Sequence, residues 1–545
     1  MASCCGKHTR ITTLFFLRRM HVDSMPWCAF VLMFSFIVTP GAVAGQERPT
    51  VHTDSGIVVG ERLTVRGGDV DAFYGIPYAV PPLGDLRFRK PVPFKSWQGV
   101  YHATSKPKPC VQMDIDIMEV APLNYSGSQE DCLYLNIWRS SKLCPAAVKC
   151  SKKQAVVVYI HGGAFQWGDS SLFLYDGSNF AASSEVLFVS FNYRVGIFGF
   201  LSIGRPELPG NMGLWDQSLA LEWVRTNIGY FGGDPYQVTL WGQSAGAASV
   251  GYHALSPQSR GLFHQIIMQS GTPLLTISMT SHDPVSRFLV LSGAVGCYDA
   301  STNWETEVSS IISCLHRVDA RKIINIISED HPRNQYYIPI SGDDFLPIDP
   351  FGENAWRELG AKKLLIGRTS NEGTLMVRFL TQSVPQLQNL NDFDYRFLLN
   401  VVFSVMLDIP VSAARDIVSA YFGDHDVQHD NDTVNSIIGE VMGDVMFNCP
   451  NKYIAIQAAA QGVDVYMYEF AHRPSFSAWP KNFGVTHADD LPFLLGTLQS
   501  IFHNGRISAA LPEEVRRHIS DISYTQEELA FMDQLVNMVS TFVKD

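Results

Sequence analysis

The stretch VTLWGQSAGAASV, residues 238–250, decides the fold of this chain. A run of β-branched and aromatic residues reaches Gly242, and a run of small residues that suits the start of a helix follows Gly246. Between them, Ser244 lies in a Gly-x-Ser-x-Gly turn, where small neighbours let the strand and the helix approach each other. Strand, turn and helix together predict a nucleophile elbow, a sharp turn that exposes a reactive serine hydroxyl.

Apolar runs of strand length recur along the chain, and several are continuous rather than alternating. Continuous runs indicate strands that are buried on both faces of a sheet. Helical patterns such as 216–228 lie between them, and this alternation predicts an α/β fold with a mostly parallel central sheet and helices on both faces. The expected strands are 155–160, 186–193, 237–241, 265–270, 362–367 and 463–470.

The two ends of this pattern differ from its middle. Short alternating runs around Gly67 and Gly68 predict antiparallel strands at the N-terminal edge of the sheet. Residues 272–360 and 380–460 hold no comparable set of strands, so we expect helical excursions above the sheet there. No repeat or linker divides the chain, and residues 45–545 are expected to form a single domain.

Composition excludes several classes of protein. The chain has 545 residues, of which 46% are hydrophobic, so it can bury a large core and is not intrinsically disordered. Its formal charge of -12 and the lack of a Lys/Arg cluster argue against a nucleic-acid partner. The sequence has no Cys-x-x-Cys or paired histidine spacing, so we expect no metal site and no cofactor.

The N-terminus is expected to direct secretion. Arg18 and Arg19 precede the apolar run 27–38, and small residues up to Ala44 suit a cleavage site. We therefore interpret residues 1–44 as a signal peptide, with Met25 as an alternative start. An uncleaved signal would anchor the chain to a membrane, but no later stretch is apolar enough to span a bilayer.

Secretion changes how the cysteines are interpreted, because an oxidising compartment favours disulfides. Removing residues 1–44 leaves seven cysteines, and pairing neighbours would close three short loops. The proposed pairs are Cys110–Cys132, Cys144–Cys150 and Cys297–Cys314, and Cys449 belongs to none of them. Two Asn-x-Ser/Thr triplets, at Asn124 and Asn431, are candidate glycosylation sites in the same compartment.

A serine hydroxyl needs a base that removes its proton and an acid that orients the base. His487 lies in a loop after the strand predicted at 463–470, and Glu372 follows the strand at 362–367. The order Ser244, Glu372, His487 is the order that the α/β-hydrolase fold uses for its triad. His161-Gly162-Gly163-Ala164 directly follows another strand, where backbone N–H groups could stabilise an oxyanion.

From about residue 50 to its end the sequence resembles the type B carboxylesterases and cholinesterases of the α/β-hydrolase superfamily. The resemblance rests on motifs that recur in order, including FYGIPYA, QEDCLYLNIW, HGGAF, SFNYRVGIFGFL, FGGDPYQVTLWGQSAG and GVTHADDLPF. It implies the Ser244, Glu372, His487 triad, an oxyanion hole of Gly163, Ala164 and Ala245, and support of the triad by Ser270. It also implies the disulfides Cys110–Cys132 and Cys297–Cys314, the ion pairs Arg87–Glu130 and Arg194–Asp216, and a chain that continues beyond Asp545.

Departures from the cholinesterase branch concern the substrate. Pro122 replaces a tryptophan expected to bind a quaternary ammonium, Leu375 and Met376 replace two phenylalanines, and Gln243 replaces a glutamate. We therefore expect a secreted serine hydrolase of small to medium, mainly neutral and apolar carboxylic esters, acting through an acyl-enzyme. The chain also has a motif set similar to that of juvenile hormone esterases, so a juvenile-hormone-like ester stays a candidate substrate. A non-catalytic adhesion protein and a cholinesterase are the alternatives, and the oligomeric state stays undetermined.

Overall fold

In the computed structural model of the chain, the described residues are 12–13, 48–114, 125–142, 152–275, 284–330, 337–352, 354–383, 392–407, 409–423, 431–477, 479–503 and 523–545. Cys144, Cys150, Asn124 and Pro122 lie outside these ranges, as does most of the expected signal peptide. The third disulfide and the first glycosylation site therefore stay predictions.

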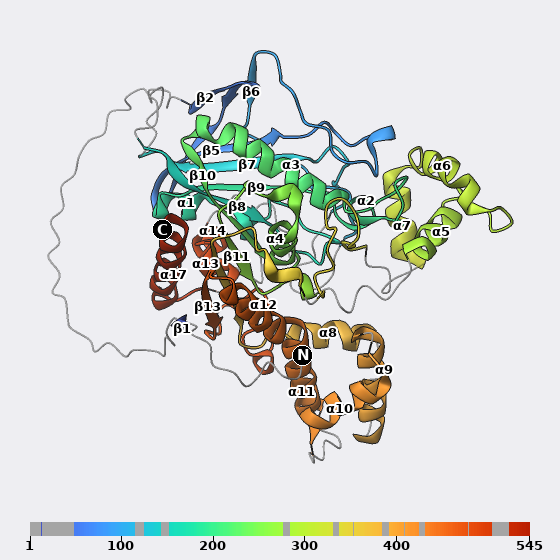
Figure 1. Cartoon of the computed structure of the whole chain (residues 1–545). Coiled ribbons are helices and arrows are strands. Elements are labelled where there is room, and N and C mark those ends of the chain that lie inside the picture. Colours follow the sequence, from blue (N-terminus) through green and yellow to red (C-terminus); the bar gives the residue numbers. More distant parts are fainter. Residues whose placement is uncertain are drawn as a thin grey trace, which may run out of the picture.

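A ten-stranded sheet forms the centre of the described molecule (Figure 1). Its strand order is β1-β13-β12-β11-β10-β8-β9-β7-β5-β4, and a separate three-stranded sheet has the order β2-β3-β6. The strands are β1 (Thr12–Thr13), β2 (Thr50–Thr53), β3 (Gly56–Val59), β4 (Glu61–Val65), β5 (Gly68–Pro77), β6 (Val100–His102), β7 (Tyr134–Ser140), β8 (Gln154–Ile160), β9 (Leu187–Phe191), β10 (Gly233–Gln243), β11 (Gln265–Gln269), β12 (Lys363–Thr369) and β13 (Asp464–Phe470).

The direction of the strands agrees with the expectation from the sequence. The six strands from β13 to β9 pair in parallel, whereas β7, β5 and β4 pair antiparallel at the N-terminal edge. All six expected strands are present, and the sequence pattern missed β7, which joins the two parts of the sheet. The α/β-hydrolase fold class is confirmed.

Helices cover both faces of the sheet. Alternate strand residues face opposite sides, and because both sets are apolar here, both faces need a covering layer. Val156, Val158 and Leu240 pack on one face, and Val157, Tyr159 and Trp241 pack on the other. The helices are α1 (Ser178–Ser184), α2 (Gly196–Phe200), α3 (Met212–Asn227), α4 (Ala245–Leu255), α5 (Pro284–Ala294), α6 (Trp304–Leu315), α7 (Ala320–Asp330), α8 (Thr374–Ser383), α9 (Asp392–Leu407), α10 (Val411–Phe422), α11 (Asn431–Gly443), α12 (Cys449–Ala460), α13 (Leu491–Leu494), α14 (Leu498–His503) and α17 (Gln526–Lys544).

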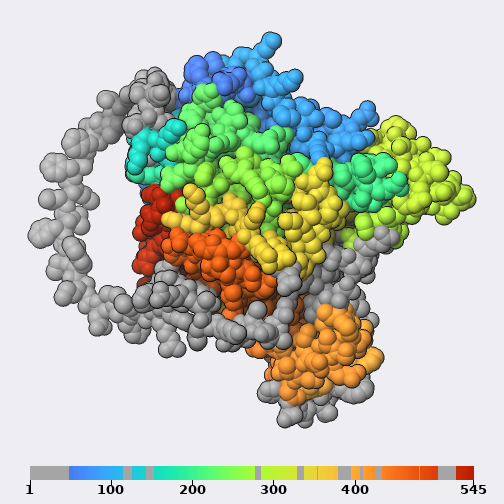
Figure 2. Space-filling view, viewed as in Figure 1, coloured from blue at the N-terminus to red at the C-terminus, as the bar shows by residue number. Residues whose placement is uncertain are grey.

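Two groups of helices project from the sheet, as predicted for 272–360 and 380–460. Helices α5, α6 and α7 form one lobe, and α8 to α11 form another with its own apolar cluster (Figures 1 and 2). Neither range contains a strand in its described part. Within the described ranges, no helix combines the length and the apolar character needed to cross a bilayer.

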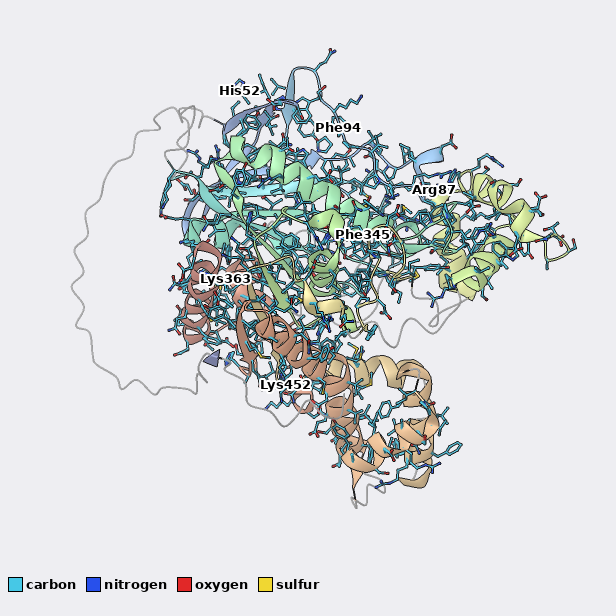
Figure 3. The ribbon with its side chains drawn as sticks, viewed as in Figure 1. His52, Arg87, Phe94, Phe345, Lys363 and Lys452 are labelled. Carbon is cyan, nitrogen blue, oxygen red and sulfur yellow. A yellow bond between two sulfur atoms is a disulfide. The ribbon has the colours of Figure 1, made fainter. Side chains whose placement is uncertain are left out.

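Two disulfides and two buried ion pairs hold the long connections. Cys110 is bonded to Cys132 and Cys297 to Cys314, and Arg194 pairs with Asp216 at 2.7 Å, all as expected. The guanidinium of Arg87 donates to both carboxylate oxygens of Glu130 at 2.6 Å. It also donates to the carbonyls of Leu315 and Val318. Figure 3 labels Arg87 close to the lobe that contains α6. Arg87 therefore ties the 110–132 segment to the end of α6.

Candidate active site

Ser244 occupies the turn between β10 and α4 that the sequence predicts. Its backbone has φ +57° and ψ -124°, a conformation that residues other than glycine rarely adopt. A Cβ at Gly246 would lie 2.1 Å from the Ile160 carbonyl oxygen of β8, so only glycine lets the helix pack against the strand here. The Ser244 N–H donates to the Gln269 carbonyl at 2.9 Å and anchors the turn to β11.

His487 and Glu372 meet at the same edge of the sheet, beyond β13 and β12. The His487 Nδ1 and Glu372 Oε2 atoms are 2.6 Å apart, and the Thr369 N–H donates to Glu372 Oε1 at 2.7 Å. Asn371 joins the two loops, because its N–H donates to the Val485 carbonyl and its Oδ1 accepts from the Val485 N–H. The predicted acid and base are therefore hydrogen-bonded partners on fixed loops.

The other ring nitrogen of His487 faces the elbow. Its Nε2 lies 3.0 Å from the side-chain nitrogen of Gln243, the residue that precedes Ser244. A neutral imidazole whose Nδ1–H donates a hydrogen bond to Glu372 keeps a lone pair on Nε2, and the Gln243 amide donates to that lone pair. In the sequence, Gln243 was notable only because it replaces a glutamate of the cholinesterase branch and so lacks a negative charge. The fold makes it a direct contact of the base.

The loop at 161–168 follows β8, the neighbour of β10. Gly163 has φ +115°, and a Cβ there would lie 1.9 Å from the Trp167 carbonyl oxygen. In the described part of the chain, the N–H groups of Gly163 and Ala164 donate to no backbone carbonyl. Ala245 opens α4, where the first N–H groups lack partners within the helix. Within the described residues these three N–H groups therefore have no backbone acceptor, and their role as an oxyanion hole stays a prediction.

Two glutamine side chains hold this loop, and each bonds both the N–H and the carbonyl of one other residue. Gln112 accepts from the Gly168 N–H at 2.7 Å and donates to the Gly168 carbonyl at 3.0 Å. Gln166 donates to the Tyr337 carbonyl at 2.6 Å and accepts from the Tyr337 N–H at 3.2 Å. Neither glutamine was predicted from the sequence, because their partners are distant in the chain.

Two carboxyl groups beside the base titrate unusually. Burial raises the pKa of Asp489 to about 7, and burial together with the charge of Glu372 raises the pKa of Asp490 to about 6. The Tyr468 hydroxyl donates to Asp490 Oδ2 at 3.0 Å. Both carboxyl groups therefore hold a proton more tightly than an exposed aspartate does. Neither aspartate was predicted as a site residue from the sequence.

Other predicted positions lie at or near the site with roles that stay predictions. Ser270 follows β11 and is fully buried, yet its hydroxyl has no hydrogen-bond partner within the described residues. Asn431 begins α11, and Leu375 and Met376 lie in α8. The described residues contain no group of three or more His, Cys, Asp or Glu side chains placed to hold a metal ion.

Comparison with known proteins identifies the family. A sequence profile described as the Carboxylesterase family matches residues 47–545. Acetylcholinesterase-1 of Trittame loki is 34% identical over 535 residues, covering 95% of this chain and 91% of that protein. Cholinesterase of Mus musculus is 34% identical over 510 residues (90% and 78%), and acetylcholinesterase of Bungarus fasciatus is 36% identical over 476 residues (84% and 75%). With its fold and these matches, the chain belongs to the carboxylesterase family and is a carboxylic ester hydrolase.

Proposed function

We propose that this enzyme hydrolyses small to medium, mainly neutral and apolar carboxylic esters through an acyl-enzyme formed on Ser244. The observation that carries the proposal is the 2.6 Å contact between His487 Nδ1 and Glu372 Oε2. This contact fixes the proton on Nδ1 and leaves Nε2 as the acceptor that faces the elbow. A base prepared in this way, in contact with the residue that precedes a strained serine, suits acyl transfer.

The reaction follows from the three parts of the site. The Gln243 amide first releases the lone pair of His487 Nε2, which then accepts the hydroxyl proton of Ser244 as Oγ attacks the ester carbonyl carbon. The N–H groups of Gly163, Ala164 and Ala245 stabilise the oxyanion of the tetrahedral intermediate. Protonated His487 then donates its Nε2 proton to the leaving alcohol, and water repeats the sequence on the acyl-enzyme.

The neutral Gln243 supports the choice of a neutral ester. A quaternary ammonium is held by aromatic faces or by nearby carboxylates, and here an amide contacts the base. The names of the three relatives favour a second candidate, a choline ester. Hydrolysis of acetylthiocholine compared with 4-nitrophenyl butyrate separates the two: we expect the higher kcat/KM for the neutral ester.

The test of the chemistry is covalent labelling of the full chain, expressed in a secreting eukaryotic host. Wild type treated with a fluorophosphonate is expected to gain one adduct by intact mass and to turn over 4-nitrophenyl butyrate. Ser244→Ala should gain no adduct and lose turnover. Ser249→Ala, a change five residues along α4, is the matched control that should keep both. A folded wild type without an adduct would contradict the proposal and favour a non-catalytic adhesion role.

We also infer that the protein is secreted after cleavage behind Ala44. The two disulfides support an oxidising compartment. The N-terminal sequence of protein from the culture medium should begin at Gly45, and glycosidase treatment should lower the mass if Asn124 or Asn431 is modified. Retention of the first 44 residues in the membrane fraction would instead support an uncleaved anchor.

A further inference from the structure

Among the described residues, the proposed base His487 hydrogen-bonds through both of its ring nitrogens, and neither bond involves Ser244. Nδ1 lies 2.6 Å from Glu372 Oε2, and Nε2 lies 3.0 Å from the amide nitrogen of Gln243. The Ser244 hydroxyl has no hydrogen-bond partner within the same residues. Because the Nε2 lone pair accepts one donor at a time, the Gln243 amide occupies the position that the Ser244 hydroxyl must take.

The Gln243 side chain is enclosed where it meets the base. It is 3% exposed at the end of β10, and a Cβ at Gly162 would lie 2.9 Å from its Oε1. The buried Phe447 ring packs against the His487 ring at 5.0 Å between centroids. A buried N–H that loses its acceptor costs free energy. The amide therefore stays on Nε2 as long as no ligand favours another arrangement.

None of the described charged groups hydrogen-bonds to Nε2. Glu372 contacts Nδ1, and Asp490 influences His487 through its charge. Asp489 accepts a backbone N–H of its own loop at 2.9 Å. All three carboxyl groups are retained when only Gln243 is replaced, so a substitution there tests the Nε2 contact by itself.

We propose that Gln243 is a positioning residue, whose amide holds His487 away from Ser244 in the free enzyme until an ester binds. This inference rests on the proposed function and adds a control of its base. As Ser244 Oγ approaches an ester carbonyl carbon, its O–H becomes more acidic and a stronger donor than the amide. The ester therefore favours the state in which the hydroxyl, rather than the amide, bonds Nε2. Without an ester the nucleophile stays unactivated.

The experiment compares the pH profiles of kcat/KM, which report the free enzyme, for the full wild-type chain and Gln243→Met with 4-nitrophenyl butyrate. The amide and a proton compete for one lone pair, so at low pH, where the proton wins, the two rates should coincide. Above the acid limb Gln243→Met should be faster by about fivefold, because one ordinary hydrogen bond no longer has to be broken. Its limb should lie higher by the logarithm of that factor, about 0.7 pH unit. The kcat value, which reports the complex, should stay within about twofold.

Two further variants complete the test. Gln243→Asn keeps an amide on a side chain shorter by one methylene, so it should behave as Gln243→Met does and serves if the methionine variant does not fold. Gln258→Met, at an exposed glutamine that donates to the Asp344 carbonyl, is the matched control and should follow the wild-type profile.

The outcomes separate this proposal from the proposed chemistry. An unchanged acid limb in folded Gln243→Met, or a loss of kcat/KM at every pH, overturns the positioning role of Gln243. A rise in kcat as large as the rise in kcat/KM overturns the release by the ester. A folded wild type that gains no fluorophosphonate adduct would instead refute the Ser244 chemistry.

Discussion

The nucleophile half and the acid–base half of the site are positioned in different ways. Ser244 and the 161–168 loop depend first on backbone conformation and on the absence of Cβ atoms at Gly163 and Gly246, and the neutral amides of Gln112 and Gln166 add hydrogen bonds to the loop. His487 and Glu372 depend instead on polar side chains, including Asn371 and Gln243. Geometry made by glycine fails when any side chain is added, whereas geometry made by hydrogen bonds also responds to charge and pH.

The largest effect is expected from a substitution in the acid–base half of the site. Glu372→Gln keeps the shape of the side chain but removes the charge that holds the Nδ1 proton of His487, so kcat should fall by about 10⁴. KM should change little, and the melting temperature should stay close to that of wild type. Steady-state hydrolysis of 4-nitrophenyl butyrate measures the effect. Glu358→Gln, at an exposed glutamate, is the control, and a fall in kcat of less than tenfold would contradict the assigned role.

The second largest effect is expected from a substitution in the nucleophile half of the site. Gly163→Ala places a Cβ against the Trp167 carbonyl and must displace the loop, so kcat should fall by about 10² to 10³. Gly204→Ala is a matched control, because Gly204 also has positive φ, +66°, but has open space around its Cβ position. Equal losses in the two variants would mean that backbone strain, rather than oxyanion geometry, causes the effect.

A smaller effect should show the sensitivity of the acid–base half to charge. Gln243→Glu replaces the donor to His487 Nε2 with a carboxylate, which favours the imidazolium over the neutral base. Glu372 already contacts the other ring nitrogen, and Asp490 and His487 influence each other through their charges, so the substitution adds a third carboxyl group near the ring. The acid limb of the kcat/KM profile should move to higher pH by about one unit.

Two controls accompany that profile. Gln243→Met, which can neither donate nor carry charge, should move the limb less than Gln243→Glu. Gln258→Glu adds the same charge at an exposed glutamine and should leave the limb unchanged. Coincident profiles for wild type and Gln243→Glu would refute the contact between Gln243 and the base in solution.

The smallest effect concerns stability. Because the pKa of Asp490 is raised from 3.8 to about 6 by burial and then by Glu372, the folded protein holds this proton more tightly than the unfolded chain does. Its contribution to stability is therefore lost as pH rises from about 4 to about 6. The melting temperature of wild type should fall between pH 4 and pH 7, and in Asp490→Asn this fall should be smaller by about 2 °C. Scans at one heating rate measure this, with exposed Asp344→Asn as control; parallel curves would contradict the shift.

The sequence by itself determined the parts of the molecule that rest on local patterns. Continuous apolar runs fixed the parallel strands, and the small residues around Ser244 predicted an elbow that the structure contains. Glu372 and His487 were predictable because each follows a strand and their order matches the fold. The strand β7 was missed because polar Asn136, Arg139 and Ser140 interrupt its apolar pattern, although all three are buried in the fold.

Only the tertiary structure decided how these parts are held. Gln112 and Gly168, Gln166 and Tyr337, and Gln243 and His487 are separated by 56, 171 and 244 residues. A glutamine in a sequence does not indicate its partner, because the side-chain amide can donate to or accept from any polar group that the fold brings within reach. The raised pKa values of Asp489 and Asp490 likewise come from burial and from neighbouring charge, which exist only once β12 and β13 lie side by side.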